Sequence, residues 1–349
     1  MVNNMDFELT RQQQMVKKMA ADFAERVCEV EAAEIDRTHN FPMETWHRIA
    51  ELGLLRVNHS EAYGGVGKDP IMEMIVIEEL SKASLTHGAA YALLGHGFPT
   101  FIEMFGTEEQ KQKYIPEILS ADKIGGFCLT EPGAGSDASG VRTTSRKEND
   151  IYVINGTKQF VTAGDISDYL LVVAQADALS GERGYTGFIV DTNSEGITIG
   201  RAENKMGICA LPTTEVIFQD VHVHEDNILG GKMGIGNMLH YALATLDGAR
   251  IGTGAQALGV ATAAFEHALK YSGERIQFGK PINANQGIKW YLADMATKLD
   301  AARLMIYRAA SLAAQGKKHS KEAAMAKLIA TTYGREVVNT ALQIYGGYG

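Results

Sequence analysis

The chain of 349 residues is poor in cysteine. It has only three, Cys28, Cys128 and Cys209, which are odd in number and far apart. Neither a disulfide framework nor a metal-ligand spacing can be read from them. We therefore expect a reducing compartment and no metal site.

The sequence also lacks an excess of positive charge and any long hydrophobic run. With 33 Lys and Arg against 42 Asp and Glu, the net charge of −9 argues against nucleic acid, because a phosphate backbone is held by cations. The longest apolar run, residues 169–174, is far too short to cross a bilayer. The first residues show no basic segment followed by an apolar stretch, so no secretory signal is visible. We expect a cytoplasmic protein that binds neither nucleic acid nor a membrane.

Proline is scarce as well, with 7 residues in the chain, and its absence marks the longest helices. Residues 255–270, 288–315 and 321–344 contain no Pro and are rich in Ala, Leu, Met and Lys. Such segments are typical of long packed helices. They predict a C-terminal helical bundle over residues 233–349.

The first part of the chain, residues 1–123, is also predicted to be helical. Thr10 with Gln13, and Thr107 with Gln110, have the spacing of a capping box, in which a Thr at the helix start pairs with a Gln three residues later. Apolar residues behind the first box recur at steps of three and four, which predicts one buried helix face. That face is formed by Val16, Met19, Phe23, Val27 and Val30.

The period changes to that of strands in the middle of the chain. Short β-branched and aromatic runs at residues 152–156, 169–174, 186–190 and 215–218 alternate with Gly, Asn and Asp, and no helical pattern fills the gaps. They predict an antiparallel β domain over residues 124–232. The fold class is therefore a multidomain α+β protein, with an N-terminal helical domain, a middle β domain and a C-terminal bundle that is incomplete at its end.

The most informative segment is FCLTEPGAGSD at residues 127–137. Its Pro and Gly residues expose backbone amides, which together with the Thr130 and Ser136 hydroxyls could bind oxygen atoms of a ligand. An exposed turn between strands explains the same composition, so the residues alone leave both interpretations open. Residues 133–138 also fit the G-x-G-x-x-A dinucleotide pattern, but residues 141–147 look extended, so we discard that interpretation.

Further motifs occur in a fixed order along the whole chain. The segment TEPGAGSD at residues 130–137 resembles the flavin loop of the acyl-CoA dehydrogenases. The other motifs that resemble this family are YGGVG at 63–67, KQFVTAG at 158–164, KMG at 205–207, FQDVHV at 218–223, RIQFG at 275–279 with Gln286, and QIYGG at 343–347. Their joint order is specific, and the sequence resembles the short-chain, butyryl-CoA dehydrogenase-like members of the family.

The resemblance implies an FAD site. Thr130 would donate to the pyrimidine edge of the flavin, Thr162 would place its hydroxyl by N5, and Phe160 would cover one ring face, although Phe127 and Phe160 without the resemblance could be sheet core. Arg275 would pair with pyrophosphate oxygens through its planar fork. The residues from Arg275 onward would act across a subunit contact, which implies a homotetramer. The implied cofactor-binding residues are Phe127, Leu129, Thr130, Gly135, Ser136, Phe160, Val161, Thr162, Arg275, Gln277, Phe278, Gln286, Gln343, Gly346 and Gly347.

The resemblance also implies an acyl-CoA substrate. Asp247 and Arg250 stand three residues apart on one helical face, a spacing that a simple surface ion pair also shows. The resemblance implies that this D-x-x-R motif binds the CoA portion. The implied substrate-binding residues are Ser136, Leu246, Asp247 and Arg250.

In this family a carboxylate removes the C2 proton of an acyl thioester while C3 gives hydride to flavin N5, and the electrons pass to an electron-transfer flavoprotein. Most members carry that Glu in a Y-E-G-T segment after the Q-x-x-G-G element, whereas a minority place it where this sequence has Ala249. The sequence ends at Gly349. No residue of this chain is therefore assigned as the catalytic base, and the expected Glu lies beyond Gly349.

Three functions are compatible with these residues. The first is FAD-dependent dehydrogenation of a short- or medium-chain acyl-CoA. The second is oxygen chemistry on the same scaffold, as in an acyl-CoA oxidase or nitroalkane oxidase. The third is a non-catalytic protein that binds flavin or a CoA ester. Acyl length and branching stay open, as does the choice between oxidation and enoyl-CoA reduction.

Overall fold

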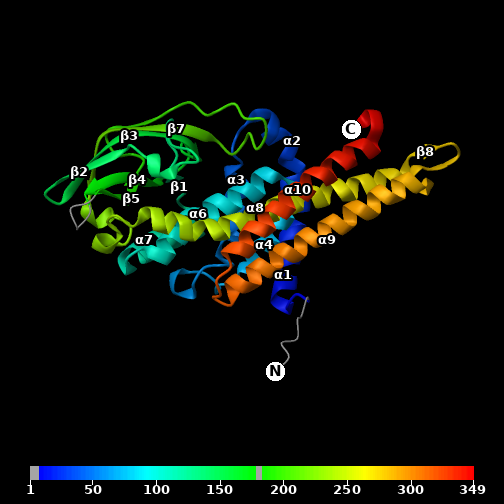
Figure 1. The fold of residues 1–349 in the computed structure, drawn as a ribbon, viewed down its shortest axis with the longest axis horizontal. Helices are drawn as coiled ribbons and strands as arrows, with labels where there is room; N and C mark the ends of the chain where they lie inside the picture. Colours follow the sequence, from blue (N-terminus) through cyan, green and yellow to red (C-terminus); the bar gives the residue numbers. More distant parts are fainter. Residues whose placement is uncertain (1–7, 178–182) are drawn as a thin grey trace, which may run out of the picture. The chain divides into compact units, whose positions relative to one another are not determined.

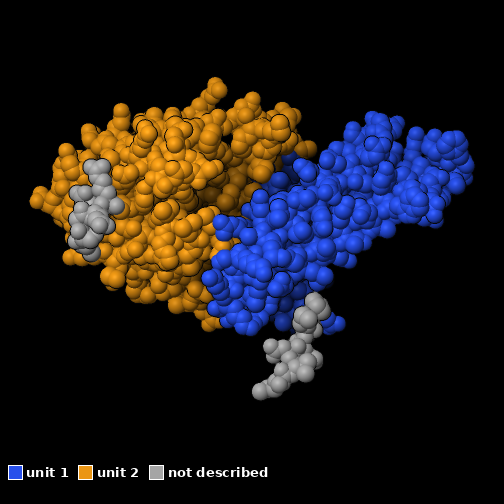
Figure 2. All heavy atoms as spheres, in the orientation of Figure 1, with its two compact units in different colours: residues 1–32, 69–88, 250–349 blue, residues 33–68, 89–249 orange. Residues whose placement is uncertain are grey.

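The computed structural model describes residues 8–177 and 183–349 (Figure 1). The chain divides into two compact units, which Figure 2 colours separately. The first unit comprises residues up to Ala32, Asp69–Gly88 and Arg250–Gly349, and the second comprises Ala33–Lys68 and Ala89–Ala249. Each unit joins segments that are far apart in sequence. The domain boundaries expected after residues 123 and 232 stay predictions.

The first unit is built mainly from long helices. The elements that contribute to it are α1 (Arg11–Phe23), a π-helical turn (Ala24–Cys28), α2 (Glu29–Thr38), α4 (Pro70–Ala83), α5 (Leu85–Ala90), α8 (Met238–Glu274), the hairpin of β8 (Ile276–Gln277) and β9 (Lys280–Pro281), α9 (Gln286–Ala314) and α10 (Ser320–Tyr345). Figure 1 shows α9 and α10 side by side, joined by a short turn. The three long helices predicted in the last third of the chain are confirmed.

The start of α1 confirms the first capping box. The Thr10 hydroxyl accepts a hydrogen bond from the Gln13 amide, and the Gln13 side chain accepts one from the Thr10 amide. The predicted apolar face is wrong at its end, because Val30 is 77% exposed. The π-helical turn at Ala24–Cys28 adds a residue to one turn and rotates the following face, so that Cys28 is buried instead.

The second unit combines short helices with the larger sheet. Its helices are α3 (Met43–Glu51), α6 (Gly97–Phe105) and α7 (Glu108–Leu119), with a π-helical turn at Tyr91–Gly95. The capping box of Thr107 and Gln110 is confirmed at the start of α7. The Gln110 side chain also donates to the Ile228 carbonyl at 2.7 Å and accepts from the Gly230 amide at 3.0 Å, which ties α7 to the end of the β domain.

The strands of the second unit follow the predicted segments. They are β1 (Gly125–Cys128), β2 (Thr144–Glu148), β3 (Ile151–Thr162), β4 (Tyr169–Asp177), β5 (Arg183–Asp191), β6 (Ile197–Ile199) and β7 (Thr213–His224). The order across the sheet is β1-β4-β2-β3-β7-β6, and β5 pairs with β4. Phe188, Phe218 and Leu170 are buried in the core of this domain.

The prediction of an antiparallel sheet is wrong for two pairings. β4 runs parallel to β1 and, through a single pair of residues, parallel to β2, whereas the remaining pairings in this sheet are antiparallel. Between β1 and β4 the chain passes through the β2–β3 hairpin, which provides the long connection that a parallel pair of strands requires. The end of β1, where the flavin loop is predicted to begin, is therefore held in the sheet by β4.

Candidate active site

The loop predicted to bind the flavin leaves the sheet at the end of β1. Phe127 lies within β1, Leu129 and Thr130 follow that strand directly, and all three residues are half-buried. The Phe127 ring packs against Phe101 with ring centroids 4.7 Å apart. These residues are thus neither deep in the sheet nor fully solvated, so part of each surface can meet a ligand.

A tight turn follows in this loop. Glu131 and Ala134 exchange backbone hydrogen bonds of 3.1 and 3.0 Å, which close the turn around Pro132 and Gly133. Gly135 comes next and is exposed, and a Cβ added to it would meet no atom within 4 Å. Ser136 is exposed as well. This part of the loop leaves room for an anionic group beside its backbone.

The second predicted flavin segment is the end of β3. Lys158 pairs with Val216, whereas Val161 pairs with Thr214, so β3 holds one extra residue there and forms a β-bulge. Within it Phe160 has φ +56°, a left-handed conformation that costs a non-glycine residue about 1–2 kcal/mol. Its side chain is 60% exposed, so Phe160 is not part of the sheet core.

The neighbouring residues behave differently. The Val161 side chain lies in the β core and is 2% exposed, so only its backbone could meet a cofactor. Thr162 is half-buried. A Cβ added to Gly126 would lie 3.5 Å from the Thr162 carbonyl oxygen, which shows that this residue lies beside β1.

The two predicted flavin segments come together in the second unit. The Gln159 amide donates to the Thr130 carbonyl at 2.8 Å, and the Lys158 ammonium donates to the Leu129 carbonyl at 3.1 Å. Residues 127–136 and 158–162 therefore adjoin one another and form one patch, in which Phe160 is exposed whereas Lys158 and Val161 are buried. The resemblance implied that both segments belong to one flavin site, which stays a prediction.

A buried ion pair that the sequence analysis did not assign supports this patch. The Lys158 ammonium lies 2.8 Å from the Glu131 carboxylate, and their side chains are 0% and 7% exposed. The same carboxylate accepts hydrogen bonds from the Arg142 amide at 2.6 Å, the Thr143 amide at 2.9 Å and the Thr143 hydroxyl at 2.6 Å. The residues are 27 apart in sequence, so no local spacing signals the pair.

Electrostatics favour the charged form of the carboxylate. Burial by itself raises the pKa of Glu131, but the hydrogen bonds from Lys158 and Thr143 and from the two backbone amides lower it overall. Burial lowers the pKa of Lys158, and the Glu131 carboxylate opposes that effect. Each charge therefore depends on its partner.

The predicted adenosine-side residues lie in the first unit and are exposed. Arg275 follows α8, and its amide donates to the Tyr271 carbonyl at 2.8 Å. Gln277 is the last residue of β8, and Phe278 follows it in the turn of the β8–β9 hairpin, where Phe278 has φ +52° and is 98% exposed. Gln286 begins α9. None of these four side chains is used as core.

The end of α10 lies beside the end of α8. The Tyr345 ring stacks on Tyr271 with centroids 4.3 Å apart, and the Tyr345 hydroxyl donates to the His267 carbonyl. This contact brings the predicted segment with Gln343, Gly346 and Gly347 next to the start of the hairpin that carries Arg275. Gln343, Gly346 and Gly347 are all exposed, so each can contact a ligand.

The predicted substrate residues of the D-x-x-R motif lie on α8. Asp247 and Arg250 are half-buried, and Leu246 is 39% exposed. All three belong to consecutive turns of one helix, as the sequence predicted.

An open cavity of about 350 Å³ lies further along α8 in the first unit. Its wall is almost wholly apolar, and its volume is at the lower end of the range for small-molecule sites. Its lining residues are Leu85, Thr253, Gln256, Ala257, Val260, Thr331, Gly334, Arg335, Val338 and Asn339. The sequence analysis did not find this cavity, because its lining comes from helices far apart in the chain.

Within residues 8–177 and 183–349, which the structure describes, no group of three or more His, Cys, Asp and Glu side chains could hold a metal ion. In the same part of the chain, no helix combines the length and the apolar character needed to cross a membrane.

Family models of the acyl-CoA dehydrogenase N-terminal, middle and C-terminal domains match residues 10–122, 126–221 and 239–349. Acyl-CoA dehydrogenases are oxidoreductases that act on the CH–CH group of acyl thioesters. The chain belongs to the acyl-CoA dehydrogenase family, whose members are flavoproteins, and the predicted fold class is confirmed.

Individual relatives agree with this assignment. Acryloyl-CoA reductase (NADH) of Anaerotignum propionicum is 44% identical over 351 residues, which cover 100% of this chain and 88% of the relative. A subunit of the caffeyl-CoA reductase–Etf complex of Acetobacterium woodii is 40% identical, with 97% and 89% covered. The solved structure of butyryl-CoA dehydrogenase from Megasphaera elsdenii is 39% identical with a TM-score of 0.94, covering 99% of this chain and 90% of that one.

Proposed function

We propose that this chain provides the FAD site and the acyl-CoA site of an enzyme that interconverts a short-chain acyl-CoA with its 2-enoyl-CoA and exchanges electrons with an electron-transfer flavoprotein. The observation that carries this proposal is the patch in which Phe160, exposed on a strained bulge, lies beside the Thr130 loop. Residues in strained backbone conformations cluster at ligand sites, because the surrounding fold must offset their cost.

The residues of this patch fit a flavin. Phe160 offers an aromatic face, Thr130 and Thr162 offer hydroxyl groups, and Gly135 leaves space for backbone contact with phosphate. When bound, FAD would supply the hydride chemistry, and the protein would supply binding and orientation. For the adenosine half we propose the exposed residues of the first unit, with Arg275 on the pyrophosphate. Their contact with FAD across a tetramer interface is part of the same proposal.

For the substrate we propose that Asp247 and Arg250 of α8 hold the CoA portion, together with Ser136 and Leu246. The apolar cavity begins at Thr253, and with a rise of about 1.5 Å per residue it starts roughly one turn beyond Arg250. A short acyl chain suits its size and apolar wall. We propose this cavity as the acyl site.

The C2 proton of an acyl thioester is weakly acidic, so a desolvated carboxylate must accept it while hydrogen bonds stabilise the enolate oxygen. We assign this base to no residue up to Gly349. The proposed electron partner is supported by the relative that forms part of a complex with an electron-transfer flavoprotein.

The test begins with reconstitution. The purified protein should retain FAD through gel filtration but show little turnover, whereas a chimera that appends the C-terminal segment of a family member should lose flavin absorbance anaerobically with butyryl-CoA. The reduced chimera should regain the absorbance with crotonyl-CoA. No bleaching in the FAD-loaded chimera would contradict the proposal. Fast reoxidation by air would favour an oxidase, and a colourless protein that cannot be loaded would favour a non-catalytic binder.

A further inference from the structure

The pair formed by Glu131 and Lys158 lies at the joint of three elements. Lys158 comes from β3, whereas Glu131 comes from the loop after β1 and binds the amides of Arg142 and Thr143 at the start of β2. A Cβ added to Gly156 would lie 2.4 Å from the Thr143 hydroxyl oxygen, so glycine at this position lets β3 approach Thr143 closely. The carboxylate thus joins the loop to both neighbouring strands.

The pair also fixes two consecutive peptide groups of the loop. The Leu129 carbonyl accepts from the Lys158 ammonium, and the Thr130 carbonyl accepts from the Gln159 amide. Because both carbonyls are held by β3, the peptide planes on either side of Thr130 cannot rotate independently. The backbone at Thr130 is therefore held in one orientation.

Stability alone does not account for such a pair. Moving two charges out of water is costly, and an apolar pair of similar volume is often equally stable in a protein interior. The best-attested role of a buried ion pair is to fix one geometry of the surrounding chain. Here the fixed geometry is that of the loop next to Phe160.

We propose that Lys158 and Glu131 are positioning residues that set the backbone of residues 129–131 for binding the flavin ring, an inference that rests on the proposed function. Neither group needs to contact FAD. Loss of the Lys158 ammonium frees the Leu129 carbonyl and removes the charge that holds Glu131 in place. FAD then meets a loop with several orientations, and its affinity falls.

The experiment compares the wild type with Lys158→Met, which keeps most of the length of the side chain, and with the neutral double variant Lys158→Met/Glu131→Gln. Lys147→Met is the charge control, because Lys147 pairs with Glu225 at 2.7 Å on β2 and is 47% exposed. Phe188→Leu is the stability control, because Phe188 is fully buried in the β core. The measurements are the FAD dissociation constant, the shape of the visible flavin absorbance, and the melting temperature of the apoprotein.

We expect Lys158→Met to weaken FAD binding by about tenfold or more, which corresponds to about 1.4 kcal/mol, and to alter the flavin band shape. Lys147→Met should match the wild type, and Phe188→Leu should melt earlier with unchanged FAD affinity. If Lys158→Met does not fold, the double variant carries the same comparison. A pair that is merely structural would lower the melting temperature as Phe188→Leu does, with wild-type affinity and band shape, and that result would overturn the inference. A wild type that binds no FAD would overturn the proposed function itself.

Discussion

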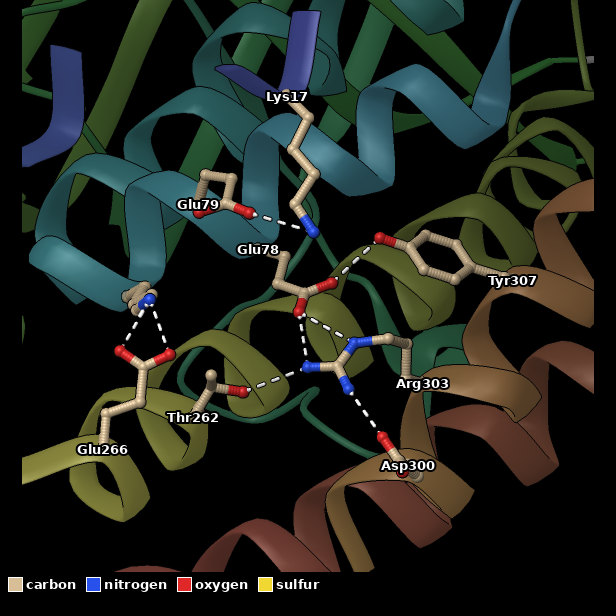
Figure 3. A network of polar contacts seen from close by, with 9 residues as sticks. Lys17, Glu78, Glu79, Thr262, Glu266, Asp300, Arg303 and Tyr307 are labelled. Atoms are coloured by element: carbon tan, nitrogen blue, oxygen red, sulfur yellow. Dashed lines mark hydrogen bonds and ion pairs between the residues drawn. The ribbon is translucent and has the colours of Figure 1, made fainter. Parts of the chain in front are cut away.

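Replacing Arg303 tests how the first unit tolerates a buried carboxylate. Glu78 of α4 is 5% exposed, and one of its oxygens accepts hydrogen bonds of 3.2 and 2.9 Å from the Arg303 guanidinium of α9. Its other oxygen accepts from the Tyr307 hydroxyl at 2.9 Å. Figure 3 shows the Glu78 carboxylate pointing at both partners. Burial works to lower the pKa of Arg303, but Glu78 raises it overall, so the Arg303 guanidinium stays charged.

The expected loss in the free energy of unfolding follows from the buried groups that each substitution leaves without a partner. Arg303→Met leaves the Glu78 carboxylate buried without its cation, and breaking a buried pair in this way costs roughly 3–5 kcal/mol. Because 28% of the Arg303 side chain is exposed, we expect the lower end, about 3 kcal/mol. Tyr307→Phe removes one hydrogen bond to a charged acceptor and should cost about 1.5–3 kcal/mol.

The assay is urea denaturation followed by circular dichroism, with Arg308→Met as the matched control. Arg308 lies on the same helix and pairs with Glu322 at 3.3 Å, but its side chain is 56% exposed, so we expect a loss of at most about 1 kcal/mol. The double variant Glu78→Gln/Arg303→Met should recover part of the loss. If Arg303→Met costs no more than Arg308→Met, the buried network does not stabilise the unit as we argue.

Three further results are expected. Burial and the nearby His59 lower the pKa of His96 well below its usual value. The contribution of His96 to the free energy of unfolding is therefore fully present above about pH 6.5, and below that pH it is lost by up to about 1.4 kcal/mol per pH unit. The variant His96→Phe should flatten this slope in urea denaturation. A Cβ on Gly65 would lie 2.0 Å from the His59 carbonyl oxygen, so Gly65→Ala should lower the free energy of unfolding by more than about 2 kcal/mol. By contrast, Gly135→Ala should change the free energy of unfolding by under about 0.5 kcal/mol but weaken FAD binding in a fluorescence titration. Val260→Phe should fill the cavity and lower kcat/KM for hexanoyl-CoA relative to butyryl-CoA about tenfold in the chimera, and an unchanged ratio would remove the cavity as the acyl site.

Local chemistry explains which parts of the fold could be predicted. Both capping boxes form as expected, because the side chain and amide that pair are three residues apart. The exposure of Val30 was not predictable, because a π-helical turn keeps the hydrogen bonding of a helix and leaves no compositional mark. The parallel pairing of β1 with β4 was missed for a related reason. Strand direction depends on which distant strand is the neighbour, and alternation within one strand does not report it.

The candidate site shows the same division between local and distant causes. Motif order along the chain was enough to name Thr130, Phe160 and Thr162 as candidates for one site, and the Gln159–Thr130 hydrogen bond places their segments together. Their contact with a flavin remains a prediction. The partner of Lys158 could not be named, because a lysine in a strand is normally a solvated residue and only the folded sheet shows that this one is buried.

The bulge in β3 explains why Phe160 could not be placed by periodicity. In a regular strand, residues two apart share a face, so a buried Lys158 would have predicted a buried Phe160. The extra residue between the pairs Lys158–Val216 and Val161–Thr214 shifts that alternation by one, so Val161 enters the core and Phe160 is exposed. The bulge therefore lets Lys158 and Val161 both lie inside, while the Phe160 ring is exposed on the patch where we propose that the flavin binds. The left-handed backbone at Phe160 has a cost, which a contact between the exposed ring and the flavin would help to offset.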